Sequence, residues 1–511
     1  MSQKKLGAVL SYVAIFINLG IALFFTPYLV KTLGKNDYGL FTMIGGLIAN
    51  LVVLEFGLND TVVKFVSQFR AKEDKDGERN FLAVMTLIYL VIATLVLTGG
   101  ACLYFFLPSI FGKGLTAAEI ETARTMLLIL TGVTAATMFF NCISGSLVAY
   151  ERFIFVRTLD LISIVGSMVA SLVVLMMGYG VIGLTIVTGG MALCLLMARV
   201  FYAFAVLKIR PKLIKFEWKQ VKEIFLFSGA VFIVIIVEQV YWRVDSAVLG
   251  ATLGTAAVAV YSIGVTFSKH FMRFGTALSK LMMPSIVSKV EKGASPAELT
   301  DVLTSISRLQ AIMLYPVLIG LIIFGRDFIS LWVGPAFQDA YWVMLLTLIP
   351  YSVELTGNVR NQIMQAKGIY WLRSRVIIVV AMVKLAATFA AIPLFGIIGA
   401  AATTGLGLVV GYIWINQLLK QKIGLEIARH RREVLHGLAP ALGLAAGIGA
   451  LTLFIPADTW SGLLIRMAIF TLAAIPCLWL VGMNDTERTL FKSLVPKRFR
   501  RQAKASDSAP G

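Results

Sequence analysis

Charged residues, cysteines and histidines are all scarce in this chain. Only 14% of the residues are charged, and the 511 residues include four cysteines and three histidines. The cysteines show no C-x-x-C spacing and each lies in an apolar stretch, so we interpret them as small buried hydrophobes without disulfide or metal roles. The histidines form no ligand cluster, and no Ser-His-Asp arrangement or phosphate-binding glycine loop is visible. The sequence therefore predicts no catalytic centre, no metal site and no cofactor.

Long apolar runs dominate the chain instead. Hydrophobic residues make up 58% of it, and the mean hydropathy is +0.86. We count about fourteen apolar stretches, from about 6–30 to about 462–482, and each has roughly the ~17–25 residues that a helix needs to cross a bilayer. The first stretch is too long for a cleavable signal peptide and lacks a small-residue cleavage site. These features predict an all-α integral membrane protein with about 14 transmembrane helices.

The distribution of basic residues predicts the orientation. The chain has 46 Lys and Arg against 27 Asp and Glu. Most of the basic residues lie at the N-terminus, in every second gap between apolar stretches, or in the C-terminal tail, so these parts are expected in the cytoplasm. The charge is spread over short loops without a basic domain. This pattern disfavours nucleic acid as a partner and favours contact with anionic phospholipids.

An internal repeat predicts the domain organisation. Gly180-Val-Ile-Gly183 returns 216 residues later as Gly396-Ile-Ile-Gly399, and two weaker echoes recur at offsets of 218 and 220 residues. An even number of helices separates the copies, so we predict two six-helix lobes in a parallel pseudo-two-fold repeat. The predicted boundaries are 1–207 for the N-terminal lobe, 208–223 for a basic cytoplasmic linker, 224–419 for the C-terminal lobe, 420–483 for an accessory helix pair and 484–511 for a basic cytoplasmic tail.

Cations inside the second lobe are candidates for substrate binding. A charge in hydrocarbon is costly, so such residues normally face a cavity or a partner. One interpretation is a cationic cavity that holds the phosphate or pyrophosphate of an anionic headgroup. The other is a set of internal ion pairs that fix helix packing. The candidates for the headgroup site are Arg243, Lys269, Arg273 and Lys384.

Acidic and amide side chains in the same stretches have open roles. Glu238, Asp245 and Glu354 are candidates for ion coupling or for charge pairing with the cations. Asn18 and Gln239 lie on matching helices of the two predicted lobes. They are candidates for contacts with substrate sugars, although amides also hold membrane helices together by hydrogen bonds.

Several short motifs resemble those of polysaccharide-biosynthesis flippases. The segments that carry the resemblance are Leu33-Gly34 with Tyr38-Gly39-Leu40-Phe41, Glu55-Phe56-Gly57-Leu58-Asn59, and Tyr241-Trp-Arg243-Val-Asp245-Ser-Ala-Val-Leu249-Gly250. The resemblance covers most of the chain. It implies two six-helix bundles like those of multidrug and toxin extruders (a MATE-like fold), which alternate between inward-open and outward-open states.

The same resemblance implies a function and a substrate. The expected protein translocates polyprenyl (undecaprenyl) pyrophosphate-linked oligosaccharides across the bacterial cytoplasmic (inner) membrane, for O-antigen, capsule or exopolysaccharide synthesis. Its partners would be that lipid-linked oligosaccharide and polysaccharide polymerase machinery. Two alternatives remain: a cation-coupled multidrug or metabolite exporter on the same fold, and a membrane glycosyltransferase or polymerase. The second would need a large outward loop or an outward acidic pair, and neither is apparent.

Overall fold

The structure is a computed structural model, and it describes residues 3–216 and 218–494. Within its helices, nothing is described for the side chains of residues 3–12, 15–16, 219–220, 223, 225–238, 240, 273–274, 277–285 and 490–494. Every regular element in the described ranges is helical. The predicted all-α class is therefore confirmed.

The chain divides into two compact units. Unit 1 takes in the described residues up to 263 together with 377–404, and unit 2 takes in 264–376 and the described residues from 405 onward. The division runs through two long helices, α9 (Thr255–Glu291) and α13 (Tyr370–Ile423). These units reflect the compactness of the structure, whereas the predicted lobe boundaries came from the sequence repeat. The lobe boundaries therefore stay a prediction.

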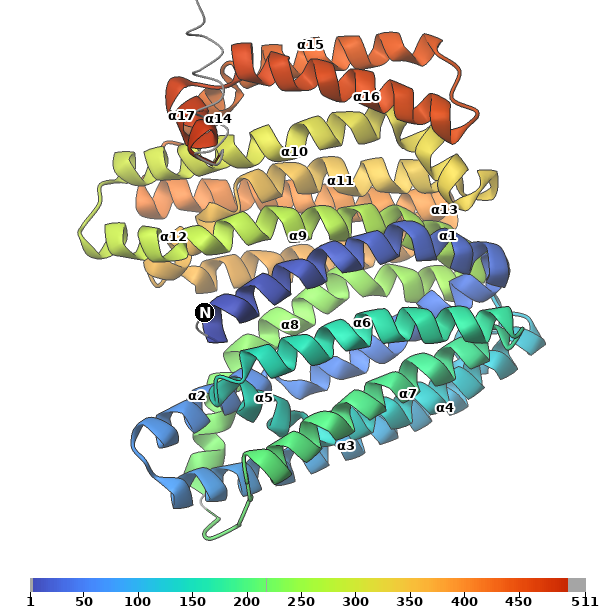
Figure 1. Ribbon diagram of the computed structural model, residues 1–511, viewed down its shortest axis with the longest axis vertical. Helices are drawn as coiled ribbons and strands as arrows, with labels where there is room; N and C mark the ends of the chain where they lie inside the picture. Colours follow the sequence, from blue (N-terminus) through green and yellow to red (C-terminus); the bar gives the residue numbers. More distant parts are fainter. Residues whose placement is uncertain (1–2, 217, 495–511) are drawn as a thin grey trace, which may run out of the picture. The chain divides into compact units, whose positions relative to one another are not determined.

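Unit 1 is a bundle of long helices. Helices α3, α4, α6 and α7 run side by side, and α2 packs against α5 (Figure 1). The core between α2, α3 and α5 is apolar, with Leu58, Phe81, Met85 and Leu147 all fully buried. Its elements are α1 (Gln3–Leu51), η1 (Val52–Glu55), α2 (Leu58–Ala71), α3 (Lys75–Phe111), α4 (Ala117–Phe139), α5 (Asn141–Ala149), α6 (Phe153–Met176), α7 (Gly180–Phe201), η2 (Tyr202–Val206) and α8 (Trp218–Leu253).

The segment between η2 and α8 is bound to the start of α3. The Asn80 side-chain oxygen accepts hydrogen bonds from the backbone N–H groups of Ile214 (2.8 Å) and Lys215 (2.9 Å). The backbone N–H of Lys212 donates to the carbonyl of Arg79 at 3.1 Å. These bonds satisfy backbone groups in a stretch that forms no helix of its own.

In unit 2, α10 (Pro296–Val333) contacts α11, α14, α15 and α16. Helices α15 and α16 also pack against each other (Figure 1). Phe324 of α10 and Phe470 of α16 meet edge to face with ring centroids 5.7 Å apart. The remaining elements are η3 (Pro335–Phe337), α11 (Ala340–Thr356), α12 (Val359–Ala366), α14 (Ile427–Leu435), α15 (Leu438–Leu451), η4 (Thr452–Phe454), α16 (Trp460–Cys477), η5 (Leu478–Gly482) and α17 (Asp485–Leu494).

The outer surfaces of the helices are apolar. Phe24, Phe105, Leu394, Phe454 and Leu472 are each more than two-thirds exposed, as expected for side chains that face lipid. Among the described residues, eight helices are long and apolar enough to cross a membrane, or nine if the bent pair formed by α14 and α15 is one span. The chain is therefore a multi-pass membrane protein, and the predicted count of about fourteen spans is not confirmed.

Two of these helices are too long for one crossing. Helix α13 has 54 residues, which at ~1.5 Å per residue would extend about 80 Å, against a hydrocarbon core of about 30 Å. It contains a break at Gly396 (φ 59°, ψ −138°), and α1 contains one at Gly34 (φ 77°, ψ 175°). Only glycine adopts such angles readily, so these two residues allow each helix to change direction.

All four cysteines are free. Cys142 is buried, but Cys102 and Cys194 are exposed on the apolar helices α3 and α7. The expectation of burial was wrong for these two residues. In a membrane protein an apolar residue can face lipid as well as the core, so an apolar neighbourhood in the sequence does not separate the two positions.

The break at Gly34 gives a direct test of this backbone requirement. A Cβ at Gly34 would meet no atom within 4 Å, so Gly34→Ala would act through backbone strain alone and should cost about 1–3 kcal/mol. Gly45→Ala is the matched control, because Gly45 lies in the same helix and also has open space. We expect a lower unfolding temperature in detergent for Gly34→Ala only. Equal behaviour of the two variants would contradict the assignment.

Candidate functional site

The described residues bring two of the predicted site residues into direct contact. The Lys384 ammonium of α13 donates to Asp245 Oδ1 of α8 at 2.6 Å and to the carbonyl oxygen of Tyr241 at 2.9 Å. Both charged side chains are only 1% exposed. This buried ion pair lies entirely within unit 1.

Hydroxyl groups from three further positions hold the carboxylate of Asp245. Its Oδ2 accepts hydrogen bonds from Tyr261 (2.5 Å) and Thr404 (2.8 Å), and its Oδ1 has a longer contact with Thr388 (3.5 Å). The Tyr241 hydroxyl donates to the carbonyl of Thr404 at 2.6 Å. We call this set the Asp245 cluster: Tyr241, Asp245, Tyr261, Lys384, Thr388, Thr403 and Thr404.

Helix geometry separates Arg243 from this cluster. Tyr241 and Asp245 are four residues apart and share one face of α8, whereas Arg243 is about 200° around the helix from each of them. Arg243 is partly buried on that other face, and so is not the partner of Asp245. Gln239 is also partly buried on α8. The backbones of Glu238 and Arg273 are helical, but their side chains lie outside the described residues.

Unit 2 holds Lys269 and Glu354. Lys269 is exposed on α9. Glu354 of α11 pairs with Arg360 of α12 at 3.0 Å, and the Arg360 side chain is 2% exposed. Arg360 also donates to Asn416 of α13 and lies 4.3 Å from the ring centre of Tyr412. Glu354 thus neutralises a buried guanidinium.

Asn18 is partly buried on α1, in unit 1. Its side-chain amide donates to the carbonyl of Ala14 at 2.9 Å, one turn earlier in the same helix. Its predicted contact with substrate sugars stays a prediction, as do the headgroup contacts of the four cations.

Three parts of unit 1 approach one another closely: α1 just after its break at Gly34, the connection between α3 and α4, and the connection between α8 and α9. Thr255, at the start of α9, donates to Glu119 of α4 at 2.7 Å. A Cβ on Gly39 of α1 would overlap the carbonyl of Thr255, and one on Gly114 would overlap the carbonyl of Gly250. We call Gly39, Gly114, Glu119, Gly250 and Thr255 the glycine seam. The charge pattern of the sequence predicts that these connections lie on the outward side of the membrane, and this orientation stays a prediction.

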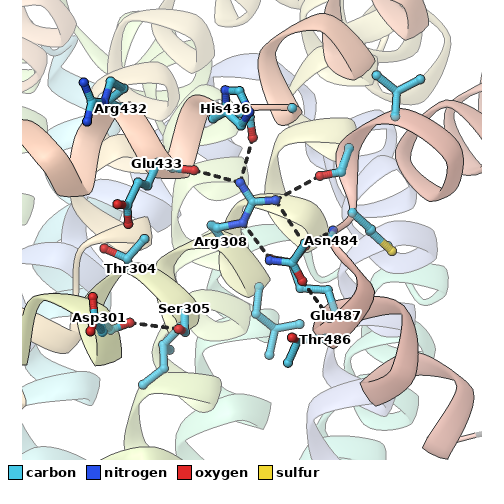
Figure 2. Close-up of a pocket in the computed structure, with 16 residues that line it drawn as sticks. Asp301, Thr304, Ser305, Arg308, Arg432, Glu433, His436, Asn484, Thr486 and Glu487 are labelled. Atoms are coloured by element: carbon cyan, nitrogen blue, oxygen red, sulfur yellow. Dashed lines mark hydrogen bonds and ion pairs between the residues drawn. The ribbon is translucent and has the colours of Figure 1, made fainter. Parts of the chain in front are cut away.

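A cavity of about 860 Å³ lies in unit 2 beside α10, α14 and α17. Figure 2 shows the guanidinium of Arg308 at its centre, directed toward Glu487 and the backbone of Glu433 and His436. Its five N–H groups all have acceptors: both Glu487 oxygens (2.7 and 3.2 Å) and the carbonyls of Glu433 (2.7 Å), His436 (2.7 Å) and Gly482 (3.0 Å). This arginine therefore fixes α14, η5 and α17 to α10, and has no N–H group left for a ligand.

Sequence reasoning missed most of these partners. Tyr261, Thr388, Thr403 and Thr404 were not identified as site residues. Arg308 and Glu487 are 179 residues apart, and Lys384 and Asp245 are 139 apart. No local pattern joins residues at such separations. The one available signal was that each is a charged residue at or near an apolar stretch, and so needs a partner.

Comparison with solved structures defines the class of fold. The chain is similar to a lipid II flippase, MurJ, in an inward closed conformation, with a TM-score of 0.72 and 16% identity over 96% of this chain and 100% of the other. It is also similar to a multidrug resistance MATE family transporter of the MOP superfamily in its inward-facing conformation, with a TM-score of 0.57 and 14% identity over 80% and 98% of the two chains. The expected MATE-like membrane-transporter fold is thus confirmed.

Sequence comparisons identify the family. The profile of the family described as polysaccharide biosynthesis protein matches residues 29–341, more than half of the chain. Two relatives from Haloferax volcanii are a probable flippase, AglR (23% identical over 78% of this chain and 79% of the relative), and a probable low-salt glycan biosynthesis flippase, Agl15 (20% identical over 81% and 83%). The chain belongs to the polysaccharide biosynthesis protein family.

Arg308 provides a test of the bonding in unit 2. Arg308→Met leaves the buried carboxylate of Glu487 without a cation and should cost about 3–5 kcal/mol of stability. Arg79→Ala is the control, because Arg79 pairs with Asp76 on an exposed surface and should contribute little. Unfolding in detergent, followed by fluorescence, measures both. Adding Glu487→Gln to Arg308→Met should restore part of the loss; equal stability of Arg308→Met and Arg79→Ala would exclude this role.

Proposed function

We propose that this protein is a flippase, a transporter and not an enzyme, that moves a lipid-linked oligosaccharide from the inner to the outer leaflet of a cytoplasmic membrane. The observation that carries the proposal is the family match, which covers residues 29–341. Both Haloferax relatives are named flippases, and they align with about four-fifths of the chain. The full-length likeness in fold to a solved lipid II flippase agrees with this assignment.

The finer proposal concerns the cargo. We infer that the cargo is a polyprenyl pyrophosphate-linked repeat unit, used for O-antigen, capsule or exopolysaccharide synthesis in a bacterium. In this proposal both termini of the protein lie in the cytoplasm. The polymerase machinery that joins such units would act next, on the outer face. An anionic headgroup moving outward across an inside-negative membrane gains about 2.3 kcal/mol per charge per 100 mV. The membrane potential therefore favours transport in this direction.

The headgroup site in this proposal contains Arg243, Lys269 and Arg273, which supply positive charge from α8 and α9. Arg forks and a Lys ammonium suit phosphate oxygens. Lys384 contributes only after it separates from Asp245, and leaving that carboxylate buried without a partner costs several kcal/mol. Asn18 and Gln239 are the proposed sugar contacts.

The glycine seam is the proposed outward gate. Alternating access requires that one end of the pathway is closed while the other is open. The Glu119–Thr255 hydrogen bond and the close backbone approaches at Gly39 and Gly114 support a closed outward end in this conformation. Glycines at these positions let helix ends touch without side chains between them, so such a seam can separate without repacking bulky groups.

Depletion of the protein from its host tests the function. We expect one complete lipid-linked repeat unit to accumulate, and the corresponding surface polymer to be lost, when lipid extracts are measured by mass spectrometry. A plasmid copy of the wild-type gene should reverse both effects. Unchanged lipid-linked intermediates would contradict the proposal and favour the multidrug or metabolite exporter. An incomplete sugar chain would instead favour the glycosyltransferase.

Cross-linking tests the gate. In a variant without the four native cysteines, Glu119→Cys and Thr255→Cys should be bridged by a short, reducible bifunctional thiol reagent, because their side chains touch. Transport in proteoliposomes should stop on cross-linking and return on reduction. Each single-cysteine variant, treated in the same way, is the control and should keep transporting. Continued transport by the fully cross-linked protein would exclude the glycine seam as the gate.

A further inference from the structure

We propose that the Asp245 cluster is a cation-binding site in which the ammonium of Lys384 takes the place of an inorganic monovalent cation. The inference concerns what this site binds. It does not depend on the nature of the transported substrate, and therefore stands or falls separately from the flippase assignment.

The oxygens around the ammonium are of the kind that bind hard cations. The Lys384 nitrogen contacts one carboxylate oxygen, Asp245 Oδ1, at 2.6 Å and one backbone carbonyl oxygen, that of Tyr241, at 2.9 Å. Carboxylates and carbonyls are the protein ligands that ions such as Na⁺ and Ca²⁺ prefer to nitrogen or sulfur. The carboxylate supplies a single negative charge, which matches a monovalent ion.

The carboxylate is held in place by groups other than Lys384. Tyr261 and Thr404 donate to its second oxygen, at 2.5 and 2.8 Å. Thr388 lies 3.5 Å from its first oxygen, and the Thr388 hydroxyl is 3.0 Å from that of Thr403. These hydroxyls come from α9 and from both parts of α13, on either side of the break at Gly396. The arrangement should therefore persist when the Lys384 side chain is removed.

The hydroxyls can also serve as ligands. A hydroxyl oxygen has two lone pairs in addition to its proton, so Thr388 can turn toward a metal ion. Thr388 is fully buried and Thr404 is 1% exposed. An ion that replaced the ammonium would thus find a carboxylate, a carbonyl and at least one hydroxyl in a site screened from water.

The energetic argument follows from burial. The side chains of Asp245 and Lys384 are each 1% exposed, so neither charge is solvated by bulk water. Removing the ammonium leaves a buried carboxylate, which must take up either a cation or a proton. The wild-type chain avoids this requirement because its cation is covalently attached and always present at high local concentration.

A tethered cation changes what the site can do. A dissociable Na⁺ would make the contact between α8 and α13 at the Asp245 cluster depend on the external sodium concentration, by mass action. Because Lys384 is part of the chain, formation of this contact depends only on the conformation of the chain. We therefore expect transport by the wild-type protein to require no sodium gradient through this site.

The experiment compares wild type with Lys384→Met, which removes the ammonium charge and keeps an unbranched apolar side chain of similar length. Both purified proteins are titrated with NaCl or KCl against choline chloride at constant ionic strength. Thermal unfolding and ²²Na⁺ binding are the two measurements. Wild type should bind no ²²Na⁺ and should unfold at the same temperature in all three salts.

Lys384→Met should unfold at a lower temperature in choline chloride and recover with saturation on addition of Na⁺ or K⁺, by on the order of 5 °C. It should bind about one cation per chain, as expected for a single site. Lys384→Met combined with Asp245→Asn has no charge to neutralise and should respond to neither salt. Lys384→Arg keeps the tethered charge and should resemble wild type.

Three results would overturn the proposal. The first is saturable ²²Na⁺ binding by the wild type that Asp245→Asn abolishes. The second is a folded Lys384→Met that is indifferent to Na⁺ and K⁺. The third is a Lys384→Met that fails to fold even in NaCl and KCl while the double variant folds, because the inorganic cation would then be unable to replace the ammonium. If neither variant folds, ²²Na⁺ binding by the wild type decides alone.

Discussion

A charged side chain in a low-dielectric helix bundle needs an opposite charge or several hydrogen-bond partners, and this requirement organises both units of the protein. Asp245 joins α8 to α13 through Lys384, Glu487 joins α17 to α10 through Arg308, and Asp327 joins α10 to α16 through Arg466 at 2.7 Å. The partners in these pairs are between 139 and 179 residues apart. Apolar packing against lipid-like surfaces is weakly specific, so such pairs define which helices meet.

The fold class could be predicted from the sequence because hydropathy is a local property. Apolar stretches of membrane-spanning length identify helices, and a membrane admits helices or closed barrels only. The number of membrane-spanning helices was less predictable from the sequence. Gly34 and Gly396 interrupt α1 and α13 without ending them, so two predicted stretches form one continuous helix with a break.

The site was only partly predictable, for a physical reason. The sequence shows that Lys384 and Asp245 are buried charges, but not that they meet, because their contact depends on how α8 and α13 pack. Lys384 was therefore interpreted as a group that faces a substrate, and in the structure it faces Asp245. Arg243, only two residues from Asp245, lies on another face of the same helix. Proximity in sequence was a poor guide to pairing, and the 100° step of the helix was the better one.

The two halves of the repeat use equivalent positions differently. At the 216-residue offset, Thr404 corresponds to Thr188, whose hydroxyl donates to the carbonyl of Leu184 in its own helix at 2.9 Å. Lys384 corresponds to Met168, which carries no charge. At these two positions the second copy of the sequence repeat carries members of the Asp245 cluster, whereas the first copy carries an uncharged methionine and a threonine bonded within its own helix.

The role of Glu487 limits where the chain can be shortened. Asn484 and Glu487 cap α17 reciprocally: the Glu487 N–H donates to Asn484 Oδ1 at 2.9 Å, and Glu487 Oε2 accepts from the Asn484 N–H at 2.9 Å. The same carboxylate supplies both of its oxygens to Arg308. A chain cut between Gly482 and Glu487 would keep every apolar helix but would lose the carboxylate that neutralises Arg308 of α10. A boundary drawn from hydropathy alone would leave out Glu487, although its carboxylate is part of the folded unit.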